Sequence, residues 1–577
     1  MFLPSRRCFA ALCLTAVLLA AALPTAWCQV HAAAQASTRR IERGRLLLQW
    51  GDPRPATRAA PSTRAASAPL SVRAPLRPQL RVQLLTDDGR RIRLDAVAAR
   101  QAAVDLSRLN TRRVAVSFAG RSAATALKSK AKAADVVEAI VPIDAPVPRL
   151  AAPARRQASA AAAISGKTRW LSLMCKFADI AEEQKPRTFF QQQYGDDVGQ
   201  LGHYWAEVSY GTISLAGSTA HGWYTLPHAR ADYVIREEGK EQMDADRLFQ
   251  DCVGAADPDV DFTGVQGVNL MFNGELDGHA WGGAACATMD GRTQCPRATW
   301  NPAWSFKNLA PLAHEMGHGY GLPHSDNSDG DADTYDNPWD LMSDVWNNAV
   351  NDQTYGTRPK HVAMIQRDRL GWVADGRKLV LPAGTHQTRR IELQYASLAD
   401  AGGVQMIVLS MPEQADPNQT VRYTLEARRR SGDYEAALAG DAVIVHRTQN
   451  ETAYSQDARV PPADRANNEE SMFKVGERWS EPDGAYAVEV ESMGVNGFVL
   501  LVTAGRGIGS GQVTGGNGPV RRTPAAPATP AAAAAQAHAP AGGGKRNAPP
   551  GTVAPKQNPR RPPIKKSPKL QKRRAWV

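Results

Sequence analysis

One short stretch of this chain restricts its fold and chemistry more than any other. It begins at His314 and reads H-E-x-x-H-x-x-G-x-x-H. Residues four apart share one face of a helix, so His314 and His318 can direct their imidazoles at one metal ion. Gly321 can take the left-handed conformation that ends a helix, and the chain can then present His324 as a third ligand. This spacing predicts a zinc site, with Glu315 beside it as a general base.

The residues around the motif favour a helix. Asn308 can cap its N-terminus, and Pro311 falls in the first turn, where a missing N–H is harmless. Apolar residues recur at three- and four-residue spacing and give the helix a core face: Leu309, Leu312, Ala313, Met316 and Tyr320. Ordinary core histidines are the alternative for a bare H-E-x-x-H, but the glycine and the third histidine in register favour zinc.

A methionine downstream of the motif adds to this prediction. The elongated zinc motif followed by a methionine turn is typical of the metzincin group of zinc peptidases. Here the segment N-P-W-D-L-M-S at 337–343 follows at a suitable distance, and Met342 is the candidate for the residue beneath the zinc ligands. A lone methionine in a turn is usually core filler, so this prediction depends on the partner motif.

Four segments together resemble the immune inhibitor A type of secreted metallopeptidase, with gametolysin-like enzymes as relatives. They are the zinc motif and residues 202–211, 222–227 and 338–343, and the resemblance covers roughly 167–375, weakening to about 505. It implies an α+β zincin fold, a mixed sheet with an active-site helix, one catalytic zinc ion and endopeptidase activity on proteins. No tyrosine immediately follows the methionine turn, so a tyrosine ligand of the astacin type is not predicted.

The first residues indicate export. Arg6 and Arg7 precede an apolar run at 9–23 that is too short to span a bilayer and is typical of a secretory signal peptide over 1–28. Cleavage after Cys28 and cleavage within 32–34 are the two alternatives. No later run is apolar and long enough for a membrane span, so we expect a released protein, extracellular or, in a bacterium, periplasmic.

The net charge of +12 is divided unevenly along the chain. Residues 29–166 hold 24 basic and 9 acidic residues, and 506–577 hold 14 basic and none acidic. Residues 167–505 hold 29 basic and 48 acidic residues, a net charge of −19. The basic charge belongs to the flanks, so a high isoelectric point does not indicate nucleic-acid binding by the central region.

Four cysteines remain after the signal peptide, an even number that fits two disulfides in an exported chain. Three pairings are open, and we favour Cys286 with Cys295, which closes a short loop, and Cys175 with Cys252. Buried free thiols are the alternative. None of the four shows C-x-x-C spacing, so they are not predicted to bind zinc.

Residues 29–166 are either a propeptide or a low-complexity spacer. Residues 80–85 and 91–94 alternate like a short hairpin around a turn at 87–89, so something small can fold there. As a propeptide this region would keep the site closed until its removal, for instance near Arg155-Arg156. No cysteine lies between 29 and 174, which excludes latency through a thiolate on the zinc.

Within the predicted catalytic domain, 167–375, buried strands are expected at 170–177, 212–215 and 267–273. The strand just before the zinc helix should form the sheet edge that binds an extended peptide, and the glycine-rich stretch 278–284 is where we expect substrate contacts; a plain surface loop is the alternative. His279 lacks a partner at ligand spacing and is not predicted to bind metal. A run of acids could hold calcium, with solvated loop acids as the alternative: Asp326, Asp329, Asp331, Asp333, Asp336 and Asp340.

Residues 376–505 contain short alternating runs typical of an antiparallel β-sandwich. Residues 506–577 are rich in Gly, Pro, Ala, Lys and Arg, so we expect a disordered tail, through which contact with nucleic acid or another polyanion is possible. The predicted function is a secreted zinc metalloendopeptidase made as a precursor, with proteins or peptides as substrates. The alternative is a secreted adhesin or surface-binding protein acting through the β domain and the tail.

Overall fold

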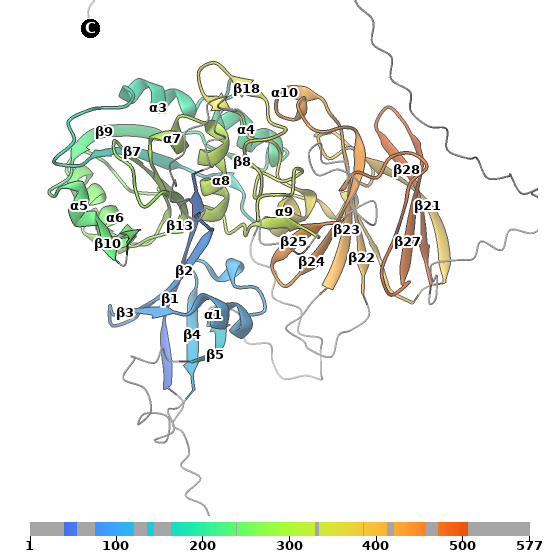
Figure 1. Ribbon diagram of the computed structural model, residues 1–577, viewed down its shortest axis with the longest axis horizontal. Coiled ribbons are helices and arrows are strands. Elements are labelled where there is room, and N and C mark those ends of the chain that lie inside the picture. Colours follow the sequence, from blue (N-terminus) through green and yellow to red (C-terminus); the bar gives the residue numbers. More distant parts are fainter. Residues whose placement is uncertain are drawn as a thin grey trace, which may run out of the picture. The chain divides into compact units, whose positions relative to one another are not determined.

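The structure is a computed structural model of the whole chain. It describes residues 40–54, 76–119, 136–143, 163–411 (except 238, 329, 331–333 and 385), 421–456 and 471–505. The predicted signal peptide, the suggested release site at Arg155-Arg156 and the basic tail lie outside these residues. None of the described helices is long and apolar enough to cross a membrane. The architecture mixes helices with several sheets, as an α+β chain should (Figure 1).

The central element is a mixed sheet whose catalytic-region strands run in the order β13-β16-β12-β7-β9. The pairs β16/β12, β12/β7 and β7/β9 are parallel, whereas β13 runs antiparallel to β16. Their bounds are β7 Trp170–Lys176, β9 Thr219–Thr225, β12 Gly267–Phe272, β13 His279–Ala284 and β16 Arg297–Asn301. A parallel sheet needs cover on both faces, and β7 is buried on both.

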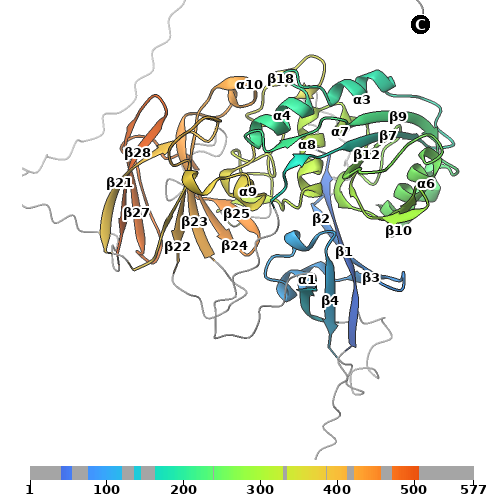
Figure 2. The ribbon, with the colours of Figure 1, turned by 180° about the vertical axis from the view of Figure 1, so that it is seen from behind.

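Two hydrophobic clusters cover the two faces. Trp170 and Met174 of β7 belong to the cluster shared with α8, while Leu171 and Leu173 belong to the cluster shared with α6, as strand alternation requires. Figures 1 and 2 show α8 and α6 on either side of the sheet. The helices of this region are α3 Arg187–Gln193, α4 Leu201–Val208, α5 Arg230–Tyr233, α6 Ala245–Ala256, α7 Ala303–Phe306 and α8 Leu309–Gly319. A further helix, α9 Met364–Arg369, packs against the C-terminal strands instead.

The sheet edge differs from the prediction in one respect. The strand directly before α8 is β16, and β16 lies inside the sheet between β13 and β12. The edge of the catalytic-region strands is the glycine-rich β13, which was expected to contact substrate. Gly282 explains why β13 can lie on the helix: a Cβ at this position would collide with the backbone carbonyl of Glu315.

The N-terminal region adds a further layer of strands to that edge. Its fourteen-residue strand β1, Arg40–Pro53, pairs with β2, β4 and β13. The predicted hairpin is present as β2/β3, and a separate cluster of buried apolar residues supports the small module (Figure 1). Its other elements are β2 Gln79–Thr86, β3 Arg91–Leu94, α1 Ala96–Ala102, the 3₁₀ turn Ser107–Leu109, β4 Arg113–Phe118 and β5 Val137–Pro142.

The C-terminal strands form two sheets that share one hydrophobic cluster, the arrangement of a β-sandwich. The first sheet has the order β17-β25-β24-β23-β22-β20 and the second β21-β28-β27-β26. Two pairs in the first sheet, β20/β22 and β17/β25, are parallel, so the sandwich is not wholly antiparallel. The bounds are β17 Ser325–Asn327, β20 Lys378–Leu381, β21 Gln387–Gln394, β22 Met406–Ser410, β23 Val421–Arg428, β24 Ala442–Gln449, β25 Thr452–Ser455, β26 Arg478–Ser480, β27 Tyr486–Met493 and β28 Gly497–Ala504.

Both favoured disulfides are present. Cys175 of β7 is bonded to Cys252 of α6, and Cys286 is bonded to Cys295 across a hairpin. The remaining short elements are the pairs β6/β8, β10/β11, β14/β15 and β18/β19, helix α10 and the turn η2: Gly166–Lys167, Ile213–Ser214, Val234–Glu237, Lys240–Met243, Ala287–Met289, Arg292–Gln294, Asn351–Asp352, Gly356–Thr357, Gly432–Glu435 and Asp375–Arg377.

Candidate metal centre

Three imidazoles meet at the end of α8. His314 and His318 lie one helical turn apart, and Gly321 takes a positive φ of 92° that ends the helix and allows His324 to return. The Nε2 atoms of His318 and His324 are 3.1 Å apart. Together with one carboxylate, these histidines offer four ligand atoms that all lie within 4.8 Å of one another. The structure therefore brings together every predicted metal ligand.

The two helix histidines are oriented by backbone carbonyls. The Nδ1 atom of His314 lies 2.7 Å from the carbonyl oxygen of Leu341, and that of His318 lies 2.8 Å from the oxygen of Leu322. A carbonyl can only accept, so each Nδ1 carries a proton, and Nε2 is the ring atom left to face a metal. Nε2 of His314 is buried and makes no hydrogen bond with the described residues, although the Asp52 carboxylate lies 3.4 Å away. A buried nitrogen in this position fits a metal-binding site.

The fourth ligand atom comes from Asp52, near the end of β1. Its Oδ1 lies 2.6 Å from Nε2 of His324, and its Oδ2 lies 3.2 Å and 3.4 Å from Nε2 of His318 and His314. Burial alone would raise the pKa of Asp52, but the charges of His324 and His314 outweigh it and hold the pKa well below its usual range. Three nitrogens and one carboxylate oxygen form a donor set suited to zinc and other transition metals.

Glu315 is fully buried beside this group. Burial, followed by the charge and hydrogen bonding of Asp52, raises the pKa of Glu315 well above its ordinary value. Burial also lowers the pKa of His318 to about 3, which keeps this imidazole neutral. The raised pKa favours the protonated form of Glu315. Burial is the larger cause, and removal of Asp52 would take away the part of the shift that its charge and hydrogen bond contribute.

The strand β1 also covers β13, the strand that was predicted to contact substrate. Residues 49–53 of β1 pair antiparallel with residues 279–283 of β13, placing Trp50 opposite Gly282. The indole of Trp50 stacks on the imidazole of His318, with ring centroids 4.9 Å apart and planes 5° apart. Figure 1 shows β1 running beside β13. The site is therefore closed by a strand and by the carboxylate that the strand carries.

Ion pairs connect this N-terminal module to the rest of the chain, in line with the charge division in the sequence. Arginines of the basic region meet acids of the central region: Arg81 with Asp277 at 3.4 Å, Arg91 with Asp246 at 2.6 Å and Arg100 with Glu451 at 3.1 Å. One pair has the opposite polarity, Arg369 with Asp105 at 2.5 Å. Complementary charge of this kind positions the two surfaces and is weakened by salt.

Met342 lies beneath the helix, where it was expected. It is fully buried, and a Cβ at Gly317 would collide with its sulfur atom. The helix can therefore approach the methionine turn only because residue 317, between the two helix ligands, is glycine. Asp340 fixes the turn by accepting hydrogen bonds from the backbone N–H groups of Met342 at 3.1 Å and Ala363 at 3.2 Å.

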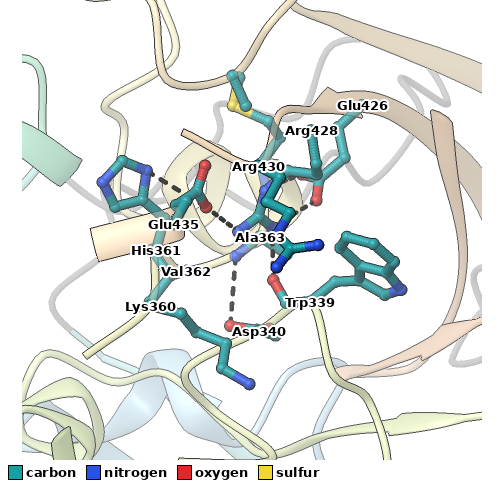
Figure 3. Close-up of polar contacts among 12 residues, drawn as sticks. Trp339, Asp340, Lys360, His361, Val362, Ala363, Glu426, Arg428, Arg430 and Glu435 are labelled. Carbon is teal, nitrogen blue, oxygen red and sulfur yellow. Dashed lines mark hydrogen bonds and ion pairs between the residues drawn. The ribbon is translucent and has the colours of Figure 1, made fainter. Parts of the chain in front are cut away.

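The β domain contacts the candidate metal centre at two places. β17 begins directly after His324 and pairs with β25, so the first sandwich sheet fixes the chain at the third ligand. In addition, Arg428 of β23 is fully buried and donates to the carbonyl oxygen of Trp339 in the methionine turn. Figure 3 shows Arg428 between Glu426 and Glu435, with which it forms ion pairs.

Other predicted residues are not part of the centre. His279 is buried against Asp277 and the carbonyl oxygen of Arg77, as a core histidine. Of the acidic run proposed for calcium, Asp329, Asp331 and Asp333 lie outside the described residues. Asp340 accepts a hydrogen bond from the N–H of Met342 in the methionine turn, and Asp336 accepts one from the N–H of Asn327. Both acids therefore bond to the protein backbone and are not simply solvated. Calcium binding remains a prediction.

Sequence reasoning missed two contributors. Asp52 directly follows a run of six mostly apolar residues at 46–51, and an acid at the end of a buried strand was the available signal. Tyr335 was missed because it precedes the methionine turn; its hydroxyl lies 2.5 Å from Oδ1 of Asp52.

Comparison with models of known protein families finds no match, and no curated protein matches the chain. The assignment of function therefore depends on the motif and on the geometry described above.

His324→Ala is expected to lower the zinc affinity of the full-length chain more than about 100-fold, because a direct ligand contributes more than the outer-shell partners worth 10- to 100-fold. Competition titration with a chelating dye and elemental analysis would measure this. His279→Gln is the matched control and should retain one zinc per chain. Equal zinc affinity in His324→Ala and the parent would contradict the assignment.

Arg428→Met is expected to destabilise the chain by about 3–5 kcal/mol, because it leaves two buried carboxylates without their cation. Urea unfolding would measure this, with the exposed Arg478→Met as control.

The same variant has an expected pH dependence. Burial raises the pKa of Glu435, but Arg428 outweighs it and the net pKa is lowered. A lowered pKa contributes stability above the unfolded-state value that is lost as pH falls through the folded-state value. The gap between the unfolding free energies of parent and Arg428→Met should therefore narrow as pH falls below about 4.5, the ordinary pKa of a glutamate. A gap that stays constant over that range would argue against this charge network.

Proposed function

We propose that this chain is the precursor of a secreted zinc-dependent endopeptidase that hydrolyses peptide bonds of proteins. One observation carries the proposal: a nitrogen atom from each of three imidazoles lies within 4.8 Å of the other two, close enough to bind one metal ion. Glu315 lies beside these nitrogens, and β13 is the adjacent edge of the catalytic-region strands. The resemblance of 167–375 to immune inhibitor A type peptidases supports the same activity. The two disulfides suit an exported protein.

Each part of the site has a role in this reaction. His314, His318 and His324 would hold the zinc ion, which when bound supplies a Lewis acid and lowers the pKa of water to about 7. Glu315 takes a proton from the attacking water and delivers it to the leaving amide nitrogen. β13 aligns the substrate by backbone pairing, which requires no particular substrate sequence. Met342 packs against α8 at Gly317, between the two helix ligands.

The N-terminal module acts as a latency device in this proposal. Asp52 occupies the place that water and the substrate carbonyl need, and β1 occupies the edge that the substrate backbone needs. No thiolate is required, because the carboxylate serves as the blocking ligand. Activation then requires removal of the segment that contains β1.

Glu315→Gln is expected to abolish hydrolysis of casein by the processed protein, since an amide cannot accept the water proton, while zinc content stays at one per chain. Chelator treatment should abolish cleavage as well. Glu275→Gln, at a solvent-exposed acid outside the ligand group, provides the control and should keep full activity. Full activity in Glu315→Gln would refute the proposed base. If the parent never cleaves while its tail binds polyanions, the adhesin alternative is favoured.

Asp52→Ala in the full-length chain is expected to raise hydrolysis of a short peptide at least about tenfold. The variant loses the contacts that hold the blocking group on the histidines, and truncating one partner of a buried charge pair weakens such an interaction by more than about 1.4 kcal/mol, which corresponds to a factor of ten. Casein should gain less, since β1 still covers β13. Asp87→Ala, in the same module but paired on its surface with Arg113, is the control and should stay latent. Unchanged latency in Asp52→Ala would show that the carboxylate does not block the site.

A further inference from the structure

The Asp52 carboxylate makes contacts that a reacting substrate would need. Its two oxygens are attached to one carbon, as are the two oxygens present once water has added to a peptide carbonyl. Oδ1 lies against His324 and Tyr335, Oδ2 lies between His314 and His318, and Glu315 faces the same group. The oxygens of Asp52 thus stand in for the attacking water oxygen and the former carbonyl oxygen.

Tyr335 contacts both the third histidine and the carboxylate. Its ring lies edge-on to the imidazole of His324, with centroids 5.6 Å apart, and its hydroxyl lies 2.5 Å from Oδ1 of Asp52. An ionised carboxylate can only accept, so the tyrosine O–H is the donor. The residue as a whole is only partly buried.

The backbone on either side of Tyr335 is anchored to the metal-site scaffold. The hydroxyl of Ser343, in the methionine turn, donates to the carbonyl oxygen of Thr334 at 3.3 Å. The N–H of Asn327, in β17, donates to Asp336 at 3.0 Å. The backbone neighbours of the tyrosine are therefore anchored to β17 and the methionine turn, which are segments separate from β1.

We propose that Tyr335 is a catalytic residue that donates a hydrogen bond to the oxygen of the scissile carbonyl as negative charge develops on it. This inference rests on the proposed peptidase function for its chemical consequence. The hydroxyl that binds Asp52 in the latent chain binds the substrate oxygen once Asp52 has left, so one donor serves both states.

The proposed hydrolysis proceeds by addition of water to the carbonyl, followed by cleavage of the C–N bond. The water oxygen forms a bond to the carbonyl carbon, and the C=O π pair moves onto the carbonyl oxygen, where the Tyr335 O–H stabilises the charge. Glu315 accepts one water proton. The C–N bond then breaks, its electron pair goes to nitrogen, and Glu315 delivers the proton there. The electron pair on the former carbonyl oxygen re-forms the C=O bond, which gives a carboxylic acid and an amine. The second water proton then passes from the acid to the amine, so the final products are a carboxylate and an ammonium group, and Tyr335 keeps its proton throughout.

A binding experiment tests the donor without relying on activity. The full-length Asp52→Ala chain, loaded with cobalt(II), would be titrated with acetate, which restores a carboxylate to the vacated position. Adding Tyr335→Phe is expected to weaken acetate binding about 10- to 100-fold, the range for a hydrogen bond to a charged group. The cobalt absorption spectrum without acetate should be unchanged, since a hydrogen-bond donor is not a metal ligand.

Tyr224→Phe provides the matched control, because Tyr224 lies on β9 at the opposite edge of the sheet from β13. It should leave acetate binding within about twofold of the parent, well below the loss expected for a direct donor. Unchanged acetate binding in Tyr335→Phe would overturn the inference. A changed cobalt spectrum without acetate would also overturn it, by making Tyr335 a metal ligand.

A kinetic experiment on the processed protein completes the test. Tyr335→Phe is expected to lower kcat about 100- to 1,000-fold, as loss of one oxyanion donor does, with little change in KM. A raised KM with unchanged kcat would contradict a role in the transition state. If acetate binding weakens as expected but neither parent nor variant hydrolyses peptides, the anion-binding role of Tyr335 stands and the peptidase proposal fails.

Discussion

The structure depends on a cluster of four polar side chains that water cannot reach freely. Three imidazoles and one carboxylate meet at the end of α8, and a buried carboxylate is costly unless opposite charge or directed hydrogen bonds compensate it. The surrounding contacts supply that compensation. Carbonyl oxygens orient two of the rings, Trp50 stacks on one of them, and burial and the Asp52 charge raise the pKa of Glu315.

The scaffold that holds these groups spans three parts of the chain. The helix provides two histidines, the segment between the helix and β17 provides the third, and the N-terminal module provides the carboxylate. Arg428 of the sandwich donates a hydrogen bond to the carbonyl oxygen of Trp339 in the methionine turn. The sandwich therefore belongs to the architecture of the metal centre, although its own sequence contains no residue that suggested chemistry.

Local sequence patterns predicted what depends on local geometry. The i, i+4 spacing of His314 and His318 fixes their common face, and Gly321 adopts the positive φ that its place in the motif requires. The strands at 170–176 and 267–272 follow from continuous apolar runs, and the disulfides from an even number of cysteines.

Long-range pairing could not be predicted in the same way. Asp52 is 262 positions before His314, and nothing in the residues near either one encodes the register that places β1 on β13. The edge role of β13 depends on strand order, which inserts β16 between it and β12. Tyr335 reaches the site through the backbone anchors of a loop with no regular period. These contacts become visible only once the sheet is assembled.

The pairing of β1 with β13 also bears on how the chain avoids aggregation. An open strand edge offers unpaired N–H and C=O groups to any other chain, and glycine-rich β13 has few side chains to discourage such pairing. While β1 is attached, the backbone groups of β13 on that side are paired within the same molecule and offer no template to another chain. If β1 is released, as proposed, the same row of backbone groups would become open, and binding of a peptide and self-association of the protein would compete for it.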